Sequence, residues 1–302
     1  MYKRIIVVGD IHAHINILNL LNTIDLTKED LIIQMGDFLD RGGEHEEVCK
    51  RLDYLCKHYK TIILLGNHEL FYLQKDYFHI IYNNRLSALK EFYKKEYNKN
   101  LRMTNYDSFS LISGLIRGNK RETRLVKLMV KYAKHYRRLL LRWIKKGRIQ
   151  LAYAGFGYLF THAGITNDLL MQSGWKGLSI ENLAKNLNAL FTKSLKEKEF
   201  EHPIFDTVWT RSAISNDFPQ VVGHTPQEEV FLAFGRHLYV DNGLFVKEDQ
   251  TKDERKKIIK LFEPDIVFLY PDGSIKSLRL GTIRDRRVRA PMPPQKYTKH
   301  AE

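Results

Sequence analysis

Apolar runs alternate with stretches of helical periodicity through the first 80 residues. The runs Ile5–Val8, Leu31–Met35 and Thr61–Leu65 have the length, and the turn residues at their ends, that are typical of buried strands. After each run, apolar residues recur three and four positions apart, as they do over residues 15–23 and 48–55, which indicates helices. The pattern therefore predicts a β-α-β-α-β-α order for this part of the chain.

Strand patterns return only after residue 148. The predicted strands are Ile149–Tyr153, Tyr158–Thr161, Gln220–Val222, Glu229–Phe234, His237–Val240, and a closing hairpin of Ile266–Tyr270 and Ser274–Leu280. A polar helix is predicted at Ile180–Lys198. Strands interleaved with helices place the chain in the α/β class.

Residues 85–148 interrupt this order and contain no clear strand pattern, so we interpret them as a helical insertion. Its last helix, Lys120–Lys146, has apolar residues at helical spacing. Twelve lysines and arginines lie between positions 120 and 148, against the single acid Glu122. This is the pattern of an amphipathic helix with a basic outer face. We expect one domain over residues 1–283 and a basic, flexible tail over 284–302.

Composition limits the class of protein and the compartment to which the chain can belong. The 302 residues are 43% hydrophobic, enough for a sizeable core, and the formal net charge of +14 bears on partners rather than on fold. Cys49 and Cys56 are two helical turns apart on a predicted helix, roughly 10.5 Å, too far for a disulfide. No apolar run reaches the ~18 residues of a membrane span. A signal peptide is rejected because its removal would take Asp10 away, so we expect a cytoplasmic protein.

Glycines end the first three predicted strands at a regular interval. Gly9, Gly36 and Gly66 are 27 and 30 residues apart, and a βαβ unit takes roughly 30 residues. Since the carboxyl ends of neighbouring parallel strands form the ligand-binding rim of an α/β sheet, the residues that follow these glycines should meet there.

The residues at these and the later strand ends are polar and include many metal-ligand types. They are Asp10, His12, Asp37, Asp40, Arg41, Asn67, His68, His162, Arg211 and His224. Carboxylates, an amide oxygen and imidazoles without a thiolate suit first-row divalent metals rather than structural zinc. Two such ions about 3.5–4 Å apart can generate a hydroxide and clamp an in-line displacement at phosphorus. One carboxylate must bridge them, and Asp37 on the middle strand is the natural candidate.

Five motifs carry a family resemblance. GDIHAH, GDFLDRG, GNHE, THAG and VGHT, in this order, resemble the motifs of the calcineurin-like metallophosphoesterases. The DRG and GNHE forms, and VWTRS between the last two motifs, resemble the phosphoprotein phosphatase branch of bacterial and phage serine/threonine phosphatases. The resemblance covers about residues 4–80 and 149–245. It implies a four-layer α/β/β/α sandwich of two mixed sheets, with the helical insertion and the tail outside the family pattern.

The resemblance also implies roles for individual residues. Asp10, His12 and Asp37 would hold one metal, and the second would be held by Asp37, Asn67, His162 and His224. His68 would be the general acid, oriented by Asp40, which is also sensible because a carboxylate can fix a histidine tautomer. Arg41 and Arg211 would grip the phosphoryl oxygens, and Asp241 would steady a ligand histidine. We expect both metal ions to be manganese, with iron or zinc as alternatives.

Three positions depart from, or add to, the family pattern. The family normally has glycine where this chain has Ala13, followed here by His14; a methyl group is tolerable there unless φ is positive. Trp209 is interpreted as a packing anchor for the strand of Arg211.

The implied activity is hydrolysis of phosphate esters by direct attack of a metal-bridging hydroxide, in a serine/threonine or dual-specificity protein phosphatase. The alternative within enzymes is a dinucleoside polyphosphate or cyclic nucleotide hydrolase. Asp40 and Glu69 favour the phosphatase, because symmetrical dinucleoside tetraphosphatases of the same superfamily tend to lack the aspartate of the DRG motif and to have GNHD where this chain has GNHE. A different class is a binding module for nucleic acid or an acidic partner, built on the Lys120–Arg148 helix. A non-catalytic relative is disfavoured because every ligand and acid position is filled.

Overall fold

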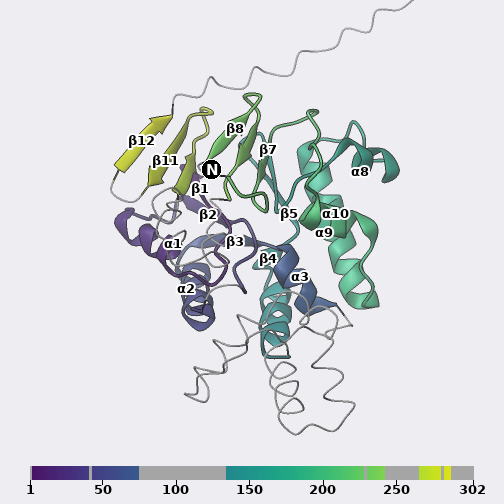
Figure 1. The fold of residues 1–302 in the computed structure, drawn as a ribbon, viewed down its shortest axis with the longest axis horizontal. Coiled ribbons are helices and arrows are strands. Elements are labelled where there is room, and N and C mark those ends of the chain that lie inside the picture. Colours follow the sequence, from purple (N-terminus) through teal and green to yellow (C-terminus); the bar gives the residue numbers. More distant parts are fainter. Residues whose placement is uncertain are drawn as a thin grey trace, which may run out of the picture.

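Two β-sheets lie face to face between outer helices (Figure 1). This computed structural model of the chain describes residues 2–40, 43–74, 134–227, 230–241, 265–279 and 282–286. Among these, no helix has both the length and the apolar character needed to cross a membrane. Residues 85–133 of the expected insertion and residues 287–302 of the expected tail lie outside the described ranges, so the predicted domain division stays a prediction.

The first sheet has seven strands in the order β12-β11-β10-β1-β2-β3-β4. Its strands are β1 (Arg4–Val8), β2 (Asp30–Gln34), β3 (Lys60–Leu64), β4 (Ile149–Gln150), β10 (Asp265–Leu269), β11 (Ile275–Arg279) and β12 (Thr282–Arg286). Strands β1 to β4 pair in parallel, whereas β10 pairs antiparallel with β1 and β11. The predicted closing hairpin is therefore confirmed.

The second sheet has five strands in the order β5-β6-β7-β9-β8. They are β5 (Ala152–Gly155), β6 (Tyr158–Thr161), β7 (Gln220–Val222), β8 (Phe231–Ala233) and β9 (His237–Tyr239). Parallel pairing of β6, β7 and β9 is flanked by antiparallel pairing of β5 with β6 and of β8 with β9. Both sheets are mixed, as the family resemblance implied.

The helices cover the outer faces of the sheets. They are α1 (Asn16–Asn19), continued by a 3-10 turn at Leu20–Thr23, α2 (His45–His58), α3 (Asn67–Leu73), a helix over residues 134–145, α8 (Asn167–Gln172), α9 (Ile180–Glu197) and α10 (His202–Trp209). In Figure 1, α1 and α2 lie on one side of the molecule, and α9 and α10 on the other.

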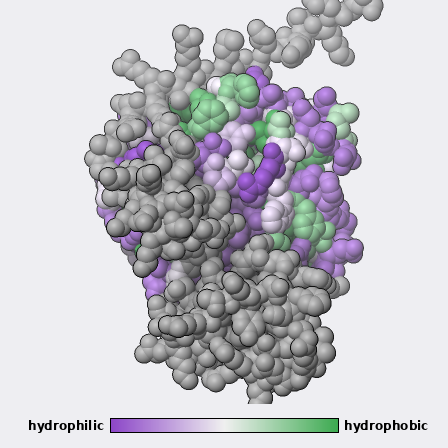
Figure 2. All heavy atoms as spheres, viewed as in Figure 1, coloured by the Kyte–Doolittle hydropathy of each residue, from purple (hydrophilic) through white to green (hydrophobic). Residues whose placement is uncertain are grey.

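Strand β1 shows why the apolar runs are continuous. Ile5 and Val7 belong to the core between the sheets, and Ile6 and Val8 belong to the core under the helices. A strand covered on both faces has no polar side to present, so it reads as an unbroken apolar run. On the face seen in Figure 2 the described surface is mainly hydrophilic, with small separate apolar patches. The four-layer arrangement is confirmed.

Three local expectations need correction. The strand predicted at Ile149–Tyr153 is two strands, β4 and β5, in different sheets. At the crossing, the side-chain Oδ1 of Asn188 accepts hydrogen bonds from the backbone N–H groups of Leu151 (2.8 Å) and Ala152 (3.2 Å), so the chain changes sheets without leaving buried donors unpaired. Strand β12 includes the first three residues of the expected tail.

Arg211 does not lie on a strand. It follows α10, whose buried residues Ile204, Thr207 and Val208 have helical spacing, and whose first turn contains Pro203, a favoured position for proline. The helix over 134–145 agrees with the predicted amphipathic pattern, since Tyr136, Leu140 and Trp143 are buried.

Candidate metal centre

The loops after β1, β2 and β3 form one connected rim. The backbone N–H groups of Ile11 and His12 both donate to the carbonyl oxygen of Asp37 (3.1 and 2.8 Å), and Ala13 N–H donates to Phe38 (3.0 Å). The three strands are adjacent and parallel, so their carboxyl ends share an edge. The predicted meeting of these strand ends is confirmed.

Two glycines allow the rim residues to approach one another. A Cβ at Gly66 would lie 2.2 Å from Asp37 Oδ1, and one at Gly223 would lie 2.3 Å from Asp10 Oδ1. Real Cβ atoms essentially never come so close, so only glycine fits these positions while the carboxylates keep their places.

The backbone is strained at several of the predicted site residues. His12, Asp37, Asp40 and His224 have positive φ angles of 46°, 52°, 65° and 61°. Each costs of order 1–3 kcal/mol, and such strain is concentrated at functional sites. Ala13 also has a positive φ, 56°, so the methyl group that replaces the family's usual glycine is held in the left-handed region.

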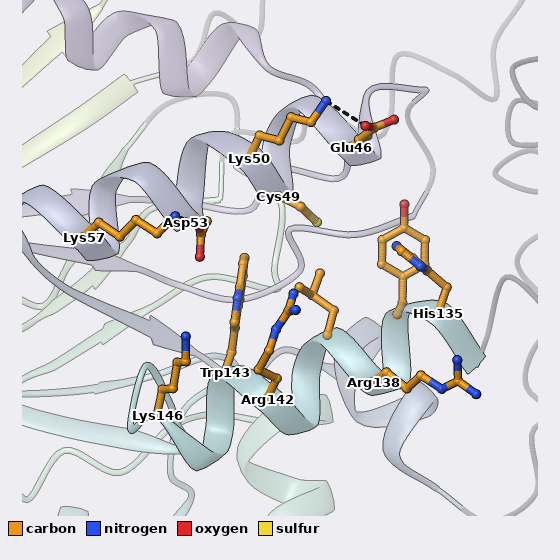
Figure 3. Close-up of a pocket in the computed structure, with 12 residues that line it drawn as sticks. Glu46, Cys49, Lys50, Asp53, Lys57, His135, Arg138, Arg142, Trp143 and Lys146 are labelled. Carbon is orange, nitrogen blue, oxygen red and sulfur yellow. Dashed lines mark ion pairs between the residues drawn. The ribbon is translucent and has the colours of Figure 1, made fainter.

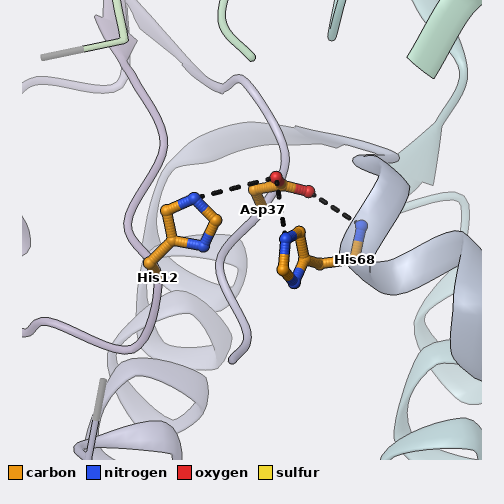
Figure 4. A group of neighbouring side chains, drawn as sticks. All are labelled: His12, Asp37 and His68. Atoms are coloured by element: carbon orange, nitrogen blue, oxygen red, sulfur yellow. Dashed lines mark hydrogen bonds and ion pairs between the residues drawn. The ribbon is translucent and has the colours of Figure 1, made fainter. Parts of the chain in front are cut away.

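Asp37 is the carboxylate around which imidazole rings gather. Its Oδ2 lies 3.8 Å from Nε2 of His12, 3.8 Å from Nε2 of His68 and 3.5 Å from Nε2 of His162. Figure 4 shows the rings of His12 and His68 next to the same carboxylate oxygen. Asp37 is a member of both groups of described side chains that could hold a metal ion, His12–Asp37–His68 and Asp37–His162–His224.

A second set of contacts joins Asn67 to two histidines. Its Oδ1 lies 3.1 Å from Nε2 of His162 and 3.1 Å from Nδ1 of His224. The Nδ1 of His162 lies 2.7 Å from the carbonyl oxygen of Met35 and must donate to it, which leaves Nε2 to face Asp37 and Asn67. A metal-binding histidine is fixed in the same way.

Asp10 lies beside these groups rather than within them. Its carboxylate accepts a hydrogen bond from the backbone N–H of His224 (3.3 and 3.2 Å to the two oxygens). Asp241 is 1% exposed, and its charge adds to the effect of burial in raising the pKa of Asp10 well above its usual value. The sequence grouped Asp10 with His12 and Asp37, whereas the structure groups His68 with this pair.

His68 is held by a chain of buried groups. Its Nδ1 lies 3.0 Å from Asp40 Oδ2, and the hydroxyl of Tyr72 donates to Asp40 Oδ1 at 2.5 Å. The backbone N–H of Asp40 donates to Nε2 of His45 (3.2 Å). Asp40 is therefore fixed on three sides, and its contact with Nδ1 leaves His68 Nε2 pointing toward Asp37. Tyr72 was not predicted as a site residue from the sequence. Its position one helical turn after His68 on α3 is the signal that could have identified it.

Glu69 is a further site residue to which the sequence assigned no role. Its carboxylate accepts hydrogen bonds from the backbone N–H groups of Asp37 (2.8 Å), Leu39 (3.0 Å) and Gly66 (3.2 Å). Its place three residues after the N-cap Gly66 lets it accept the N–H of that glycine, which is the half of a capping box that a residue without a side chain allows. Glu69 thus ties the loop of Asp37 to the start of α3.

We expect Glu69→Gln to lower the free energy of unfolding by about 1–3 kcal/mol, because the new amide N–H₂ would face backbone donors that need an acceptor. Urea unfolding of the metal-free protein measures the change. The exposed Glu29 gives a matched control: Glu29→Gln should stay within about 0.5 kcal/mol of the parent. Equal values for the two variants would contradict the clamping role of Glu69.

The rim of the site carries an arginine and two aromatic rings. Arg211 is exposed and close enough to His224 to lower its pKa. The ring of Trp209, 37% exposed, lies 5.1 Å from that of Phe71 and 6.0 Å from that of His224, edge to face. Trp209 therefore packs against the site itself, not under a strand of Arg211. Arg41 lies outside the described residues.

The charges of the site are strongly coupled. Burial would raise the pKa of Asp37, but His162 and His68 lower it well below its usual value. Burial opposes the charged form of His162, yet Asp37 and Asp10 raise its pKa to about 10. Burial, and then the neighbouring His162, lower the pKa of His224 to about 3. Burial and the charge of Asp37 raise the pKa of Glu69 to about 8.

The donor set fits divalent cations. Two ligand atoms of one ion, each about 2.0–2.2 Å from it, lie roughly 3–3.6 Å apart, close to the 3.5–3.8 Å between Asp37 Oδ2 and the three imidazole nitrogens. The Oδ1 of Asn67 is 3.1 Å from both Nε2 of His162 and Nδ1 of His224, a spacing in the same range.

The pKa of His162 predicts how pH acts on the metal-free protein. Its folded value of about 10 exceeds its unfolded value of about 6.5, so its stabilising charge is complete below pH 6.5 and is lost as pH rises toward 10. Glu69, raised to about 8, acts in the same direction. A metal needs His162 neutral, so its binding should strengthen over this range.

We therefore expect the melting temperature in EDTA to fall between pH 6.5 and 8.5, and the rise on adding Mn²⁺ to grow over the same interval. Differential scanning fluorimetry at constant ionic strength measures both. A manganese-induced rise that is the same at both pH values would contradict the protonated state assigned to His162.

The family model of the calcineurin-like phosphoesterases matches residues 3–268. No curated protein sequence matches the chain. The chain is similar to a cold-active protein-tyrosine phosphatase from a psychrophilic Shewanella, with 16% identity and a TM-score of 0.56 over 94% of this chain and 80% of that one.

Two further solved structures resemble the chain more distantly. A protein serine/threonine phosphatase from Saccharomyces cerevisiae, described as similar to human phosphatase PP5, has 15% identity and a TM-score of 0.47 over 94% of this chain and 77% of its own. A putative diadenosine tetraphosphatase has 12% identity and a TM-score of 0.46 over 92% of this chain and 94% of its own.

Proposed function

The chain belongs to the calcineurin-like phosphoesterase family, and from this membership we propose that it is a protein phosphatase that removes phosphate from serine, threonine or tyrosine side chains. Membership makes it a metal-dependent hydrolase of phosphoric esters. The narrower proposal rests on one observation, the fixed pair of His68 and Asp40, with 3.0 Å between Nδ1 and Oδ2. A serine or threonine alkoxide is a poor leaving group and needs a proton, whereas a nucleotide phosphate leaves without one.

The site residues take the following proposed roles. One cation is assigned to Asp10, His12 and Asp37, and the other to Asp37, Asn67, His162 and His224. When bound, the two cations supply Lewis acidity, which activates water and offsets the charge of the phosphoryl group. The short contact of His162 with Met35 and the buried Asp241 beside Asp10 support the orientation of these ligands.

The remaining groups act on the substrate. His68, with Nδ1 engaged by Asp40, presents Nε2 and gives its proton to the leaving oxygen. Arg211, exposed after α10, binds phosphoryl oxygens as a planar donor, and we assign the same role to Arg41. The half-exposed Trp209 and its neighbour Phe71 offer an apolar wall to a phosphotyrosine ring. Manganese and a cytoplasmic location are the choices that we carry over from the sequence.

The second candidate function is hydrolysis of dinucleoside polyphosphates. The exposed ring of Trp209 beside His224 is the observation that favours it, because a nucleobase can stack on such a ring.

A comparison of substrates decides between the two functions. The purified protein with Mn²⁺ is expected to have a higher kcat/KM on phosphoserine, phosphothreonine or phosphotyrosine peptides than on diadenosine tetraphosphate, measured by phosphate release and by chromatography of nucleotides. A clear preference for diadenosine tetraphosphate would refute the protein phosphatase proposal and leave the family assignment standing.

A further inference from the structure

A cleft outside the metal centre separates α2 from the helix over residues 134–145. It has a volume of about 540 Å³, within the roughly 300–1,000 Å³ that is typical of ligand sites. Figure 3 shows side chains of the two helices facing each other across it, with Trp143 and Arg142 projecting toward α2. Buried Tyr136 and Trp143, together with Leu139 and Cys49, give the cleft an apolar lining.

The charges of the cleft do not balance. Five of its lining residues are lysine or arginine, and two, Glu46 and Asp53, are acidic. On α2 each cation is paired, Lys50 with Glu46 (2.7 Å) and Lys57 with Asp53 (2.6 Å). On the opposite wall Arg138, Arg142 and Lys146 are exposed and form no ion pair with any residue that the structure describes. An excess of positive charge therefore lies along one wall.

The spacing of these three cations suits an extended chain. They are four residues apart on, and just after, one helix, so each is about 6 Å from the next along the axis. Alternate side chains of an extended peptide are about 6.6–6.8 Å apart. Acidic side chains at every second position of a peptide could therefore meet the three cations in succession, while the residues between them contact the apolar lining.

A peptide fits this cleft better than a nucleic acid does. On the α2 wall Glu46 and Asp53 are paired with Lys50 and Lys57, so this wall adds no net positive charge for the continuous phosphate charge of a nucleic acid strand. A peptide carries backbone N–H groups that can donate to these carboxylates. The cleft beside the basic helix, which the sequence associated with either partner, is thus a surface of mixed charge.

The cleft also adjoins the proposed catalytic groups. Tyr136 lines it, and its ring lies 5.9 Å from that of Tyr72 and 5.8 Å from that of His45. Together with His68, these are the side chains that bond Asp40. A ligand in the cleft would therefore contact Tyr136, which packs against the residues that hold Asp40.

We propose that the cleft between α2 and residues 134–145 binds a short acidic segment of a protein, with Arg138, Arg142 and Lys146 as its anionic contacts. As a docking site for protein substrates it rests on the proposed phosphatase function, but the binding itself does not require catalysis.

The test is direct binding of a fluorescein-labelled eight-residue peptide of alternating glutamate and alanine, followed by fluorescence anisotropy at low salt. The double variant Arg138→Glu/Arg142→Glu should bind at least about tenfold more weakly than the parent. The matched control, Lys134→Glu/Lys145→Glu, makes the same charge change at exposed positions of the same helix that do not line the cleft, and should differ from the parent by less than about twofold. Circular dichroism melting curves check that each variant is folded.

Lys146→Glu, in the turn after the helix, repeats the test with a single charge change, and it too should weaken binding. Equal weakening in both double variants would show a general charge effect and overturn the proposal. Tighter binding of an eight-nucleotide oligothymidylate than of the peptide would overturn it as well. Neither result depends on phosphatase activity, so failure here is separate from failure of the proposed function.

Discussion

Replacing Asp37 with asparagine is expected to lower metal-dependent turnover of p-nitrophenyl phosphate by at least about 10³-fold, or about 4 kcal/mol of barrier. Asp37 is the one side chain shared by both described groups that could hold a metal. An amide keeps the shape and can still accept the backbone N–H of His68 (2.9 Å), but it lacks the negative charge that two cations would share. The loss should therefore appear in metal binding before it appears in the fold.

The measurement pairs kcat with the metal content of the purified protein. Asp37→Asn should retain fewer than two ions per chain, with a metal-free melting curve that remains cooperative. Asp217→Asn, the same change at an exposed position, serves as the control and should keep both activity and metal. Full activity in Asp37→Asn would show that the metal centre is misassigned.

Replacing His68 with asparagine is expected to lower kcat by a factor that depends on the leaving group of the substrate. On a phosphoserine peptide the loss of kcat should be about 10²–10⁴-fold, the usual contribution of general acid catalysis. On p-nitrophenyl phosphate, whose phenolate leaves without a proton, the loss should be less than about tenfold. Asp40→Asn should show the same pattern to a smaller extent, because Asp40 orients His68 Nδ1 rather than contacting substrate.

The structure makes this experiment discriminating, because His68 also belongs to a group that could hold a metal. If His68 were a ligand, its replacement would lower metal content and slow both substrates alike. Tyr72→Phe is the conservative control, since it removes only the hydroxyl that donates to Asp40. A uniform loss on both substrates would rule out the acid role.

Much of the site could be predicted because the information is local. Each strand of the α/β pattern ends in a glycine turn, and the residues that follow necessarily emerge at the carboxyl edge. Parallel neighbours then bring Asp10, Asp37 and Asn67 together, as the registers of β1, β2 and β3 show.

Other features could not be read from the sequence, because they depend on contacts between distant segments. Glu69 and Asp37 are 32 residues apart, and their hydrogen bond exists only once β2 and β3 are adjacent. The change of sheet at Leu151 depends on Asn188 of α9. The end of α10 before Arg211 was misread because four residues do not separate helical from strand periodicity.

The sequence by itself determined the class of fold and the chemical types of the site residues, since apolar periodicity and strand-end ligands are properties of neighbouring positions. Only the tertiary structure decided which imidazole rings lie around Asp37, how Tyr72 and His45 fix Asp40, and that the basic helix faces α2 across a cleft. The reason is physical: side-chain type and spacing are written along the chain, whereas distance, burial and the resulting pKa values arise only when the two sheets and their helices pack together.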